Sequence, residues 1–101
     1  MLKVNDKVYI HIKELKTSID KMGFNTDRLC IVQSIETAKD VDGNDVGIYK
    51  LKSVGSEKEY RIFTNDRVWK ITEADKLIDI IKNSDSIDKQ MKEQILEKIY
   101  E

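Results

Sequence analysis

Six residues near the middle of the chain could bind a metal ion. The stretch DVDGND places oxygen-bearing side chains at Asp40, Asp42, Asn44 and Asp45. A calcium loop of the EF-hand type needs oxygen ligands at positions 1, 3 and 5, glycine at position 6 and a bidentate glutamate at position 12. With Asp40 as position 1, glycine falls at position 4 and Leu51 stands at position 12. Because Asp-Gly between two strand-like runs is a strong turn signal, we predict a turn and no metal site.

Two other groups that could carry out chemistry occur once each. His11 is the only histidine and lies between Ile10 and Ile12 in an alternating segment, so we predict a surface position. Cys30 is the only cysteine and lies within a strand-like apolar run, which predicts a buried, inert thiol and a reducing cytoplasm. The sequence contains neither a glycine-rich phosphate loop nor a nucleophile elbow. We therefore expect no enzyme and no cofactor.

Composition narrows the class of protein further. The 101 residues are 40% hydrophobic and 37% charged, which fits one small domain with a modest core and a charged surface. Residues 1–72 contain 13 Lys and Arg against 11 Asp and Glu, and residues 73–101 contain 5 against 8. Neither part has the basic excess typical of nucleic-acid binding. No apolar run approaches the ~18 residues of a membrane span, and the N-terminus lacks a signal-peptide core, so we expect a cytoplasmic protein with no membrane partner.

Most of the chain shows the alternation of short strands. Strands are predicted at residues 6–12, 28–36, 46–54, 59–63 and 68–71. The first connection, residues 13–27, is long and has room for one helical turn around residues 18–22. DVDGND joins the second and third strands, GSEK makes a tight turn before the fourth, and TNDR (residues 64–67) suits a single 3₁₀ turn before the fifth.

The pattern becomes helical after residue 72. Apolar residues at 74, 77, 78 and 81 follow the spacing of an amphipathic helix, for which Thr72 is the predicted N-cap. A second helix is predicted from Ser86 to residue 100, with one apolar stripe of Ile87, Met91, Ile95 and Ile99. Helices of this length are not stable alone in water, so the stripe must pack on the strands, on a second copy or on a partner.

The strand pattern also resembles a known family. NDKVYI (5–10) and RLCIVQSI (28–35) resemble the first two strands of SH3-like small barrels of the KOW and Tudor kinds. YRIFTNDRV (60–68) is similar to the closing segment of small barrels encoded by phages and mobile elements of Gram-positive bacteria. The resemblance covers residues 4–71, and it departs from the family pattern at Asn5 and Asp27, where such families usually have glycine.

The resemblance implies a mainly β protein with an α tail. Residues 1–72 would form a five-stranded SH3-like small barrel, followed by two C-terminal helices in residues 73–101 that pack on the barrel or serve association. It also implies a non-enzymatic protein–protein interaction module, such as a phage or mobile-element accessory protein that modulates a host protein.

Two surfaces are candidates for partner binding. Trp69 could pack in the core, or it could form a recognition groove with Tyr9, Tyr49 and Tyr60. Lys50, Lys52 and Arg61, with Lys58 and Lys70 nearby, could instead form a nucleic-acid-binding face, although neighbouring acidic residues dilute its charge. We predict another protein as the partner, with nucleic acid as the alternative, and self-association through the second helix is a further possibility.

Overall fold

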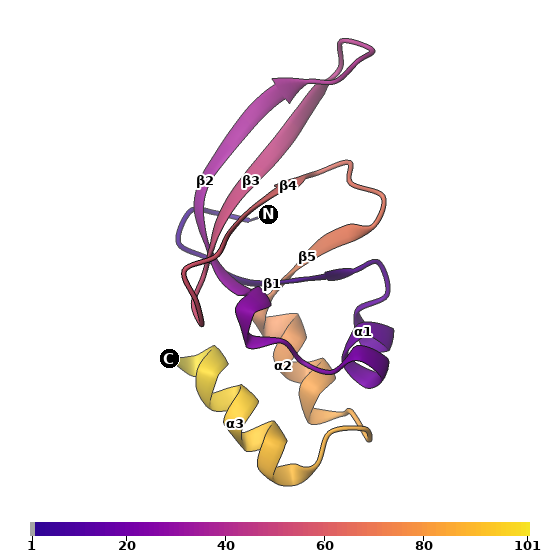
Figure 1. Ribbon diagram of the computed structural model, residues 1–101, viewed down its shortest axis with the longest axis vertical. Helices are drawn as coiled ribbons and strands as arrows, with labels where there is room; N and C mark the ends of the chain where they lie inside the picture. Colours follow the sequence, from indigo (N-terminus) through magenta and orange to yellow (C-terminus); the bar gives the residue numbers. More distant parts are fainter. Residues whose placement is uncertain (1) are drawn as a thin grey trace.

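The fold is a single antiparallel sheet with helices packed on one side. The computed structural model describes residues 2–101 and is shown in Figure 1. The strands are β1 (Lys7–Ile12), β2 (Leu29–Lys39), β3 (Asp45–Ser53), β4 (Glu59–Phe63) and β5 (Trp69–Glu73). Their spatial order is β4-β3-β2-β1-β5, so the last strand returns to pair with the first. The prediction of a mainly β protein with five strands is confirmed.

The sheet is open at its two edge strands. Among the described residues, β4 pairs only with β3, and β5 pairs only with β1. Closure into a barrel would require β4 and β5 to pair, and the sheet is not closed in this way. The confirmed class is therefore a five-stranded antiparallel sheet with three α-helices.

β2 and β3 form a long hairpin that extends away from the body (Figure 1). It accounts for the elongated shape of the molecule, whose principal extents are 47 × 24 × 23 Å. β2 continues to Lys39, three residues beyond the predicted end, because residues 37–39 pair with residues 45–47 of β3. These positions carry no strong apolar alternation, so the pairing with β3 extends the strand beyond what the sequence pattern indicates.

The DVDGND segment is the turn of this hairpin, as predicted. The carboxylate of Asp40 accepts hydrogen bonds from the backbone N–H groups of Asp42 (2.9 Å) and Asn44 (2.8 Å). Gly43 has φ +83°, in the region that favours glycine. The Asp40 carboxylate thus bonds to the backbone of the turn itself. The segment also follows a strand, whereas an EF-hand loop follows a helix.

Two apolar layers lie on opposite faces of β1. The inner layer, enclosed by the curved sheet, consists of Val8, Ile10, Cys30, Val32, Leu51 and Ile62. The outer layer joins the sheet to the helices and consists of Tyr9, Ile19, Leu29, Leu77, Ile81, Ile95 and Ile99. Alternation along β1 sends successive side chains to opposite layers, and its four central residues are all buried.

Three helices cover the outer face of the sheet. They are α1 (Leu15–Met22), α2 (Ala74–Lys82) and α3 (Lys89–Tyr100). α1 is longer than the single turn expected there, because Ile19 packs into the outer layer and gives the helix a buried side. The two C-terminal helices lie where the apolar spacing predicts them, with α3 beginning three residues after its expected cap.

Both predicted helix caps were wrong. Thr72 does not cap α2, because it lies within β5 and Glu73 occupies the N-cap position. Ser86 does not cap α3, because the carboxylate of Asp88 accepts the hydrogen bond of the Met91 N–H at 2.7 Å.

Residues 64–67 form a turn rather than a 3₁₀ helix. The 3₁₀ helix in the described part of the chain is η1 (Thr26–Arg28).

Polar contacts fix the C-terminal helices to the rest of the chain. The hydroxyls of Ser84 and Ser86 donate to the carboxylate of Asp20 in α1 at 2.7 and 2.9 Å. The ammonium of Lys7 donates to the carbonyl of Ile99 at 3.0 Å, at the negative end of the α3 dipole. Among residues 2–101, no helix is long and apolar enough to cross a membrane.

Replacement of Ile95 by alanine should test this docking. Ile95 is 4% exposed, so its loss should lower the free energy of unfolding by about 2–4 kcal/mol through lost burial and a cavity. Met91, on the same helix, is 49% exposed, and Met91→Ala should cost less than about 1 kcal/mol. Urea denaturation of both variants measures the difference. Equal effects would contradict the packing of α3 on the sheet.

Calcium should not stabilise the DVDGND turn. Two backbone hydrogen bonds to one oxygen of Asp40 already close the turn, and among the described residues no group of acidic side chains converges to hold a metal ion. We expect the melting temperature to be the same in millimolar calcium and in excess chelator, as measured by circular dichroism. Magnesium serves as the control for nonspecific ionic effects, and a calcium-specific rise would show that the turn is an ion site.

Candidate functional site

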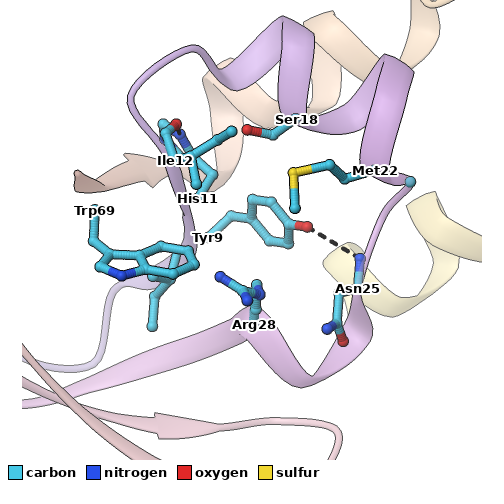
Figure 2. A pocket seen from close by; sticks show the side chains of 10 residues that line it. Tyr9, His11, Ile12, Ser18, Met22, Asn25, Arg28 and Trp69 are labelled. Atoms are coloured by element: carbon cyan, nitrogen blue, oxygen red, sulfur yellow. Dashed lines mark hydrogen bonds between the residues drawn. The ribbon is translucent and has the colours of Figure 1, made fainter.

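A small pocket lies between β1, α1, the segment before η1 and the start of β5 (Figure 2). Its volume is about 80 Å³. Tyr9 and His11 contribute from β1, and Met22 and Asn25 line it on the α1 side. Residues far apart in the sequence meet here, because β5 returns to pair with β1.

Trp69 forms one wall of this pocket and is half-buried. Its indole packs against the inner apolar layer and also borders the pocket, so it is both a packing residue and a surface for contact. Asp66 fixes its position, since the Asp66 carboxylate accepts hydrogen bonds from the backbone N–H groups of Trp69 (2.7 Å) and Val68 (2.8 Å). These two bonds stabilise the ionised form and lower the pKa of Asp66 below its ordinary value.

Arg28 stacks on Trp69. The guanidinium carbon lies 4.2 Å from the centre of the indole ring, a cation–π arrangement. The neighbouring acid, Asp27, forms an ion pair with Lys58 instead, with 3.1 Å between the ammonium nitrogen and a carboxylate oxygen. Among the described residues, no acidic side chain forms an ion pair with Arg28. The pocket therefore carries an oriented positive charge that is not neutralised by a contacting carboxylate.

Tyr9 is almost fully buried at 2% exposure, yet its hydroxyl reaches the pocket (Figure 2). The ring stacks on Phe24 with 4.8 Å between the ring centres. The hydroxyl oxygen accepts a hydrogen bond from the backbone N–H of Asn25 at 3.0 Å. Burial raises the pKa of Tyr9 above its ordinary value, so the hydroxyl keeps its proton and can still donate it.

His11 is buried, and its predicted surface position was wrong. It is 4% exposed because the helices cover the second face of β1, which the sequence pattern suggested was open to solvent. Its Nδ1 contacts the carbonyl oxygen of Ile12, which requires a proton on Nδ1, and its Nε2 then accepts from the hydroxyl of Thr72 at 2.6 Å. Burial lowers the pKa of His11, so the ring is held neutral.

Cys30 is buried, as predicted. It is fully enclosed in the inner layer, and burial raises the pKa of its thiol to about 12. Because the thiolate is the nucleophilic form, this thiol is unreactive near neutral pH.

The predicted aromatic groove is only partly assembled. Tyr9 belongs to the outer layer, whereas Tyr49, Tyr60 and Trp69 pack against the inner layer. Tyr49 and Trp69 share a second cavity of about 230 Å³ that Phe63 also lines. Trp69 therefore borders both cavities, but the sheet separates Tyr9 from Tyr49 and Tyr60.

The predicted basic face is largely paired within the molecule. Lys50 lies directly opposite Arg61 in the β3–β4 hairpin. Arg61 contacts Glu36 at 3.6 Å and Lys52 lies 4.0 Å from Glu57, while Lys58 pairs with Asp27 as described above.

Lys70 donates to the backbone carbonyl of Asp66 at 2.9 Å, so it also has a partner within the chain. The ion pairs of Lys52, Lys58 and Arg61 reduce the positive potential on which nucleic-acid binding would depend.

The predicted association stripe of α3 is divided between core and surface. Ile95 and Ile99 are buried in the outer layer, and Ile87 packs against it. Met91 alone of the four is half-exposed, so the stripe mainly packs within the same chain. Among the described residues, no group of His, Cys, Asp or Glu is arranged to hold a metal ion.

Sequence reasoning missed Arg28 and Asn25. The segment FNTDR does carry a local signal for a capped turn: the Asn25 side chain accepts a hydrogen bond from the Asp27 N–H at 2.9 Å and caps η1. Nothing in the local sequence links Arg28 to Trp69, since their contact depends on the pairing of β5 with β1.

Comparison with known proteins adds no assignment. No family model matches the chain, and neither curated proteins nor solved structures give a match.

The burial of His11 predicts a pH-dependent stability. Its pKa is lowered in the folded state, so the unfolded chain binds the proton more readily. The contribution is fully present above the unfolded pKa of about 6.5 and is lost as the pH falls through the lower folded pKa. The free energy of unfolding should therefore decrease between about pH 7 and pH 5.5.

His11→Gln is the matched variant, because it cannot titrate and His11 is the only histidine. Urea denaturation at several pH values should give a flatter pH dependence for the variant over this range. The same slope in both proteins would show that His11 does not control it.

Proposed function

We propose that this protein is a non-enzymatic protein-interaction module that captures a segment of another protein at the pocket between Tyr9, Arg28 and Trp69. One observation carries the proposal: a half-buried tryptophan holds an arginine that forms no ion pair with a described acidic residue, at the mouth of a pocket. Tryptophan, tyrosine and arginine are the residue types most enriched at the energetic centres of protein interfaces.

An SH3-like barrel is the proposed fold family. The strand order β4-β3-β2-β1-β5, with every pair antiparallel, supports it. So does the sequence of connections: a long first one that contains α1, a short one between β3 and β4, and a turn that brings β5 back to β1. In this arrangement the pocket lies beside the first long connection.

A protein partner fits the pocket better than nucleic acid does. One face of Trp69 is covered by Arg28, which hinders base stacking there. A cavity of about 80 Å³ accommodates the end of one side chain rather than a nucleobase. The basic residues of the β3–β4 hairpin are mostly paired with acids, so they offer little uncompensated charge to a phosphate backbone.

The family resemblance suggests the biological setting. We propose an accessory protein of a phage or mobile element, working in the cytoplasm on a host protein. The buried, unpaired thiol of Cys30 is compatible with that reducing compartment.

Selection from a displayed random-peptide library on the immobilised full chain tests the proposed function. Enriched peptides should bind in calorimetry, and Trp69→Ala should weaken them by at least about tenfold because it removes the pocket wall. Trp69→Phe retains more of the packing, so it is the control that distinguishes lost binding from lost folding. Tyr100→Ala removes an aromatic ring that is 65% exposed on α3 and should leave affinity unchanged.

The same preparation should form no complex with single- or double-stranded nucleic acid in a mobility-shift titration at low salt. A salt-dependent complex, together with no enriched peptide, would favour the nucleic-acid alternative and overturn the proposed function.

A further inference from the structure

The pocket beside Trp69 has the chemistry of an anion site. None of its ten lining residues is an aspartate or glutamate, and Arg28 is its one permanently charged side chain. His11 also lines it, but both ring nitrogens have hydrogen-bond partners and burial keeps the ring neutral. A negatively charged group entering the pocket would therefore meet one positive charge and no negative charge from its walls.

The guanidinium is held in a defined orientation before any ligand arrives. Its stacking on Trp69 at 4.2 Å restricts the side chain and leaves the N–H groups at the ring edge for hydrogen bonding. The acid next to it in sequence is committed to Lys58 at 3.1 Å, so Arg28 gains no ion pair from that neighbour. A fixed guanidinium suits a planar carboxylate, which can accept two parallel hydrogen bonds.

A second donor, the Tyr9 hydroxyl, lines the same pocket. The Tyr9 side chain is 2% exposed, and its hydroxyl oxygen already accepts from Asn25, which leaves its proton available. Within the described residues, no acceptor takes that proton. Figure 2 shows the Tyr9 hydroxyl directed toward Asn25 and the Arg28 guanidinium beside the Tyr9 ring, nearer Trp69; both residues line the pocket. A buried donor without an acceptor is unfavourable, so an incoming acceptor would relieve it.

The size of the cavity limits the ligand. About 80 Å³ is roughly half of the ~150 Å³ of a cavity that binds benzene, so the pocket takes a small group of a few heavy atoms. A carboxylate with one methylene group fits this volume. Phosphate groups are usually recognised by clusters of arginines, whereas this pocket provides one.

We propose that this pocket binds the side-chain carboxylate of an aspartate or glutamate in the partner segment, through Arg28 and the Tyr9 hydroxyl. The inference rests on the proposed function for its biological meaning, but it concerns a binding chemistry that can be measured without the partner. Recognition of this carboxylate makes the module selective for segments that contain aspartate or glutamate.

Trp69 provides a direct readout, because it is the only tryptophan in the chain and it stacks on Arg28. Blocked glutamate (N-acetylglutamate N-methylamide) is titrated against the full chain, and blocked glutamine is the uncharged control. We expect blocked glutamate to change the Trp69 emission and to shift the Trp69 Nε1–H and Arg28 Nε–H resonances, with a dissociation constant of about 1–10 mM. Blocked glutamine should produce no saturable change.

Three variants test whether the response to blocked glutamate arises at this pocket. Arg28→Gln should weaken blocked glutamate at least about tenfold, since a charge-assisted pair is lost. Arg67→Gln removes the same charge from an exposed position nearby that does not line the pocket, and it should bind as the wild type does. Tyr9→Phe keeps the buried ring but removes the hydroxyl, which is the proposed donor and also the acceptor of the Asn25 N–H, so it should weaken binding by about threefold to tenfold. Circular dichroism checks that each variant is folded.

The outcomes separate this inference from the proposed function. No saturable response to blocked glutamate, or an equal response in Arg28→Gln, would overturn the carboxylate site even if library peptides bind at Trp69. Blocked phosphoserine is a third probe, and tighter Arg28-dependent binding of it would reassign the pocket to phosphate. Arg28-dependent binding of blocked glutamate with no enriched peptide would support the site while the proposed function failed.

Discussion

The burial of β1 on both faces is the constraint on which the rest of the structure depends. Val8 and Ile10 point into the inner layer, while Tyr9 and His11 point into the layer beneath the helices. A five-stranded sheet of this size encloses few apolar side chains, so the helical layer supplies a second core. The C-terminal helices are thus part of the fold's stability, and the Lys7 and Asp20 contacts hold them in place.

The pocket is a consequence of the same arrangement. β1 pairs with β2 on one side and with β5 on the other, which brings Arg28, immediately before β2, next to Trp69, at the start of β5. α1 adds the remaining wall because Ile19 anchors it to the outer layer. The Tyr9 hydroxyl reaches the pocket from a ring that is otherwise part of the core, so recognition and packing share one side chain. Substitutions that disturb β1 should therefore affect both stability and binding.

Periodicity in the sequence located the regular elements well. The five strands, the DVDGND turn and the two C-terminal helices follow from alternation, turn residues and apolar spacing, which are local properties. Helix caps were less predictable, because several Ser, Thr and Asp side chains near each end could fill the role. Thr72 bonds to His11, and Ser86 bonds to Asp20, so tertiary partners took the two groups that local reasoning assigned to caps. The predicted surface position of His11 was wrong because alternation identifies the two faces of a strand but does not show whether other elements cover both of them.

The candidate site was the least predictable part. The residue type singles out Trp69, but the sequence is compatible with both a surface and a core role, and the structure places Trp69 at the boundary of the two. Tyr9 was grouped with Tyr49 and Tyr60, from which the sheet separates it. By itself, the sequence determined the strands, the two C-terminal helices and a buried Cys30, because each depends on residues close together in the chain. Only the tertiary structure decided which face of β1 the helices cover and that Arg28 meets Trp69, because both depend on long-range strand pairing.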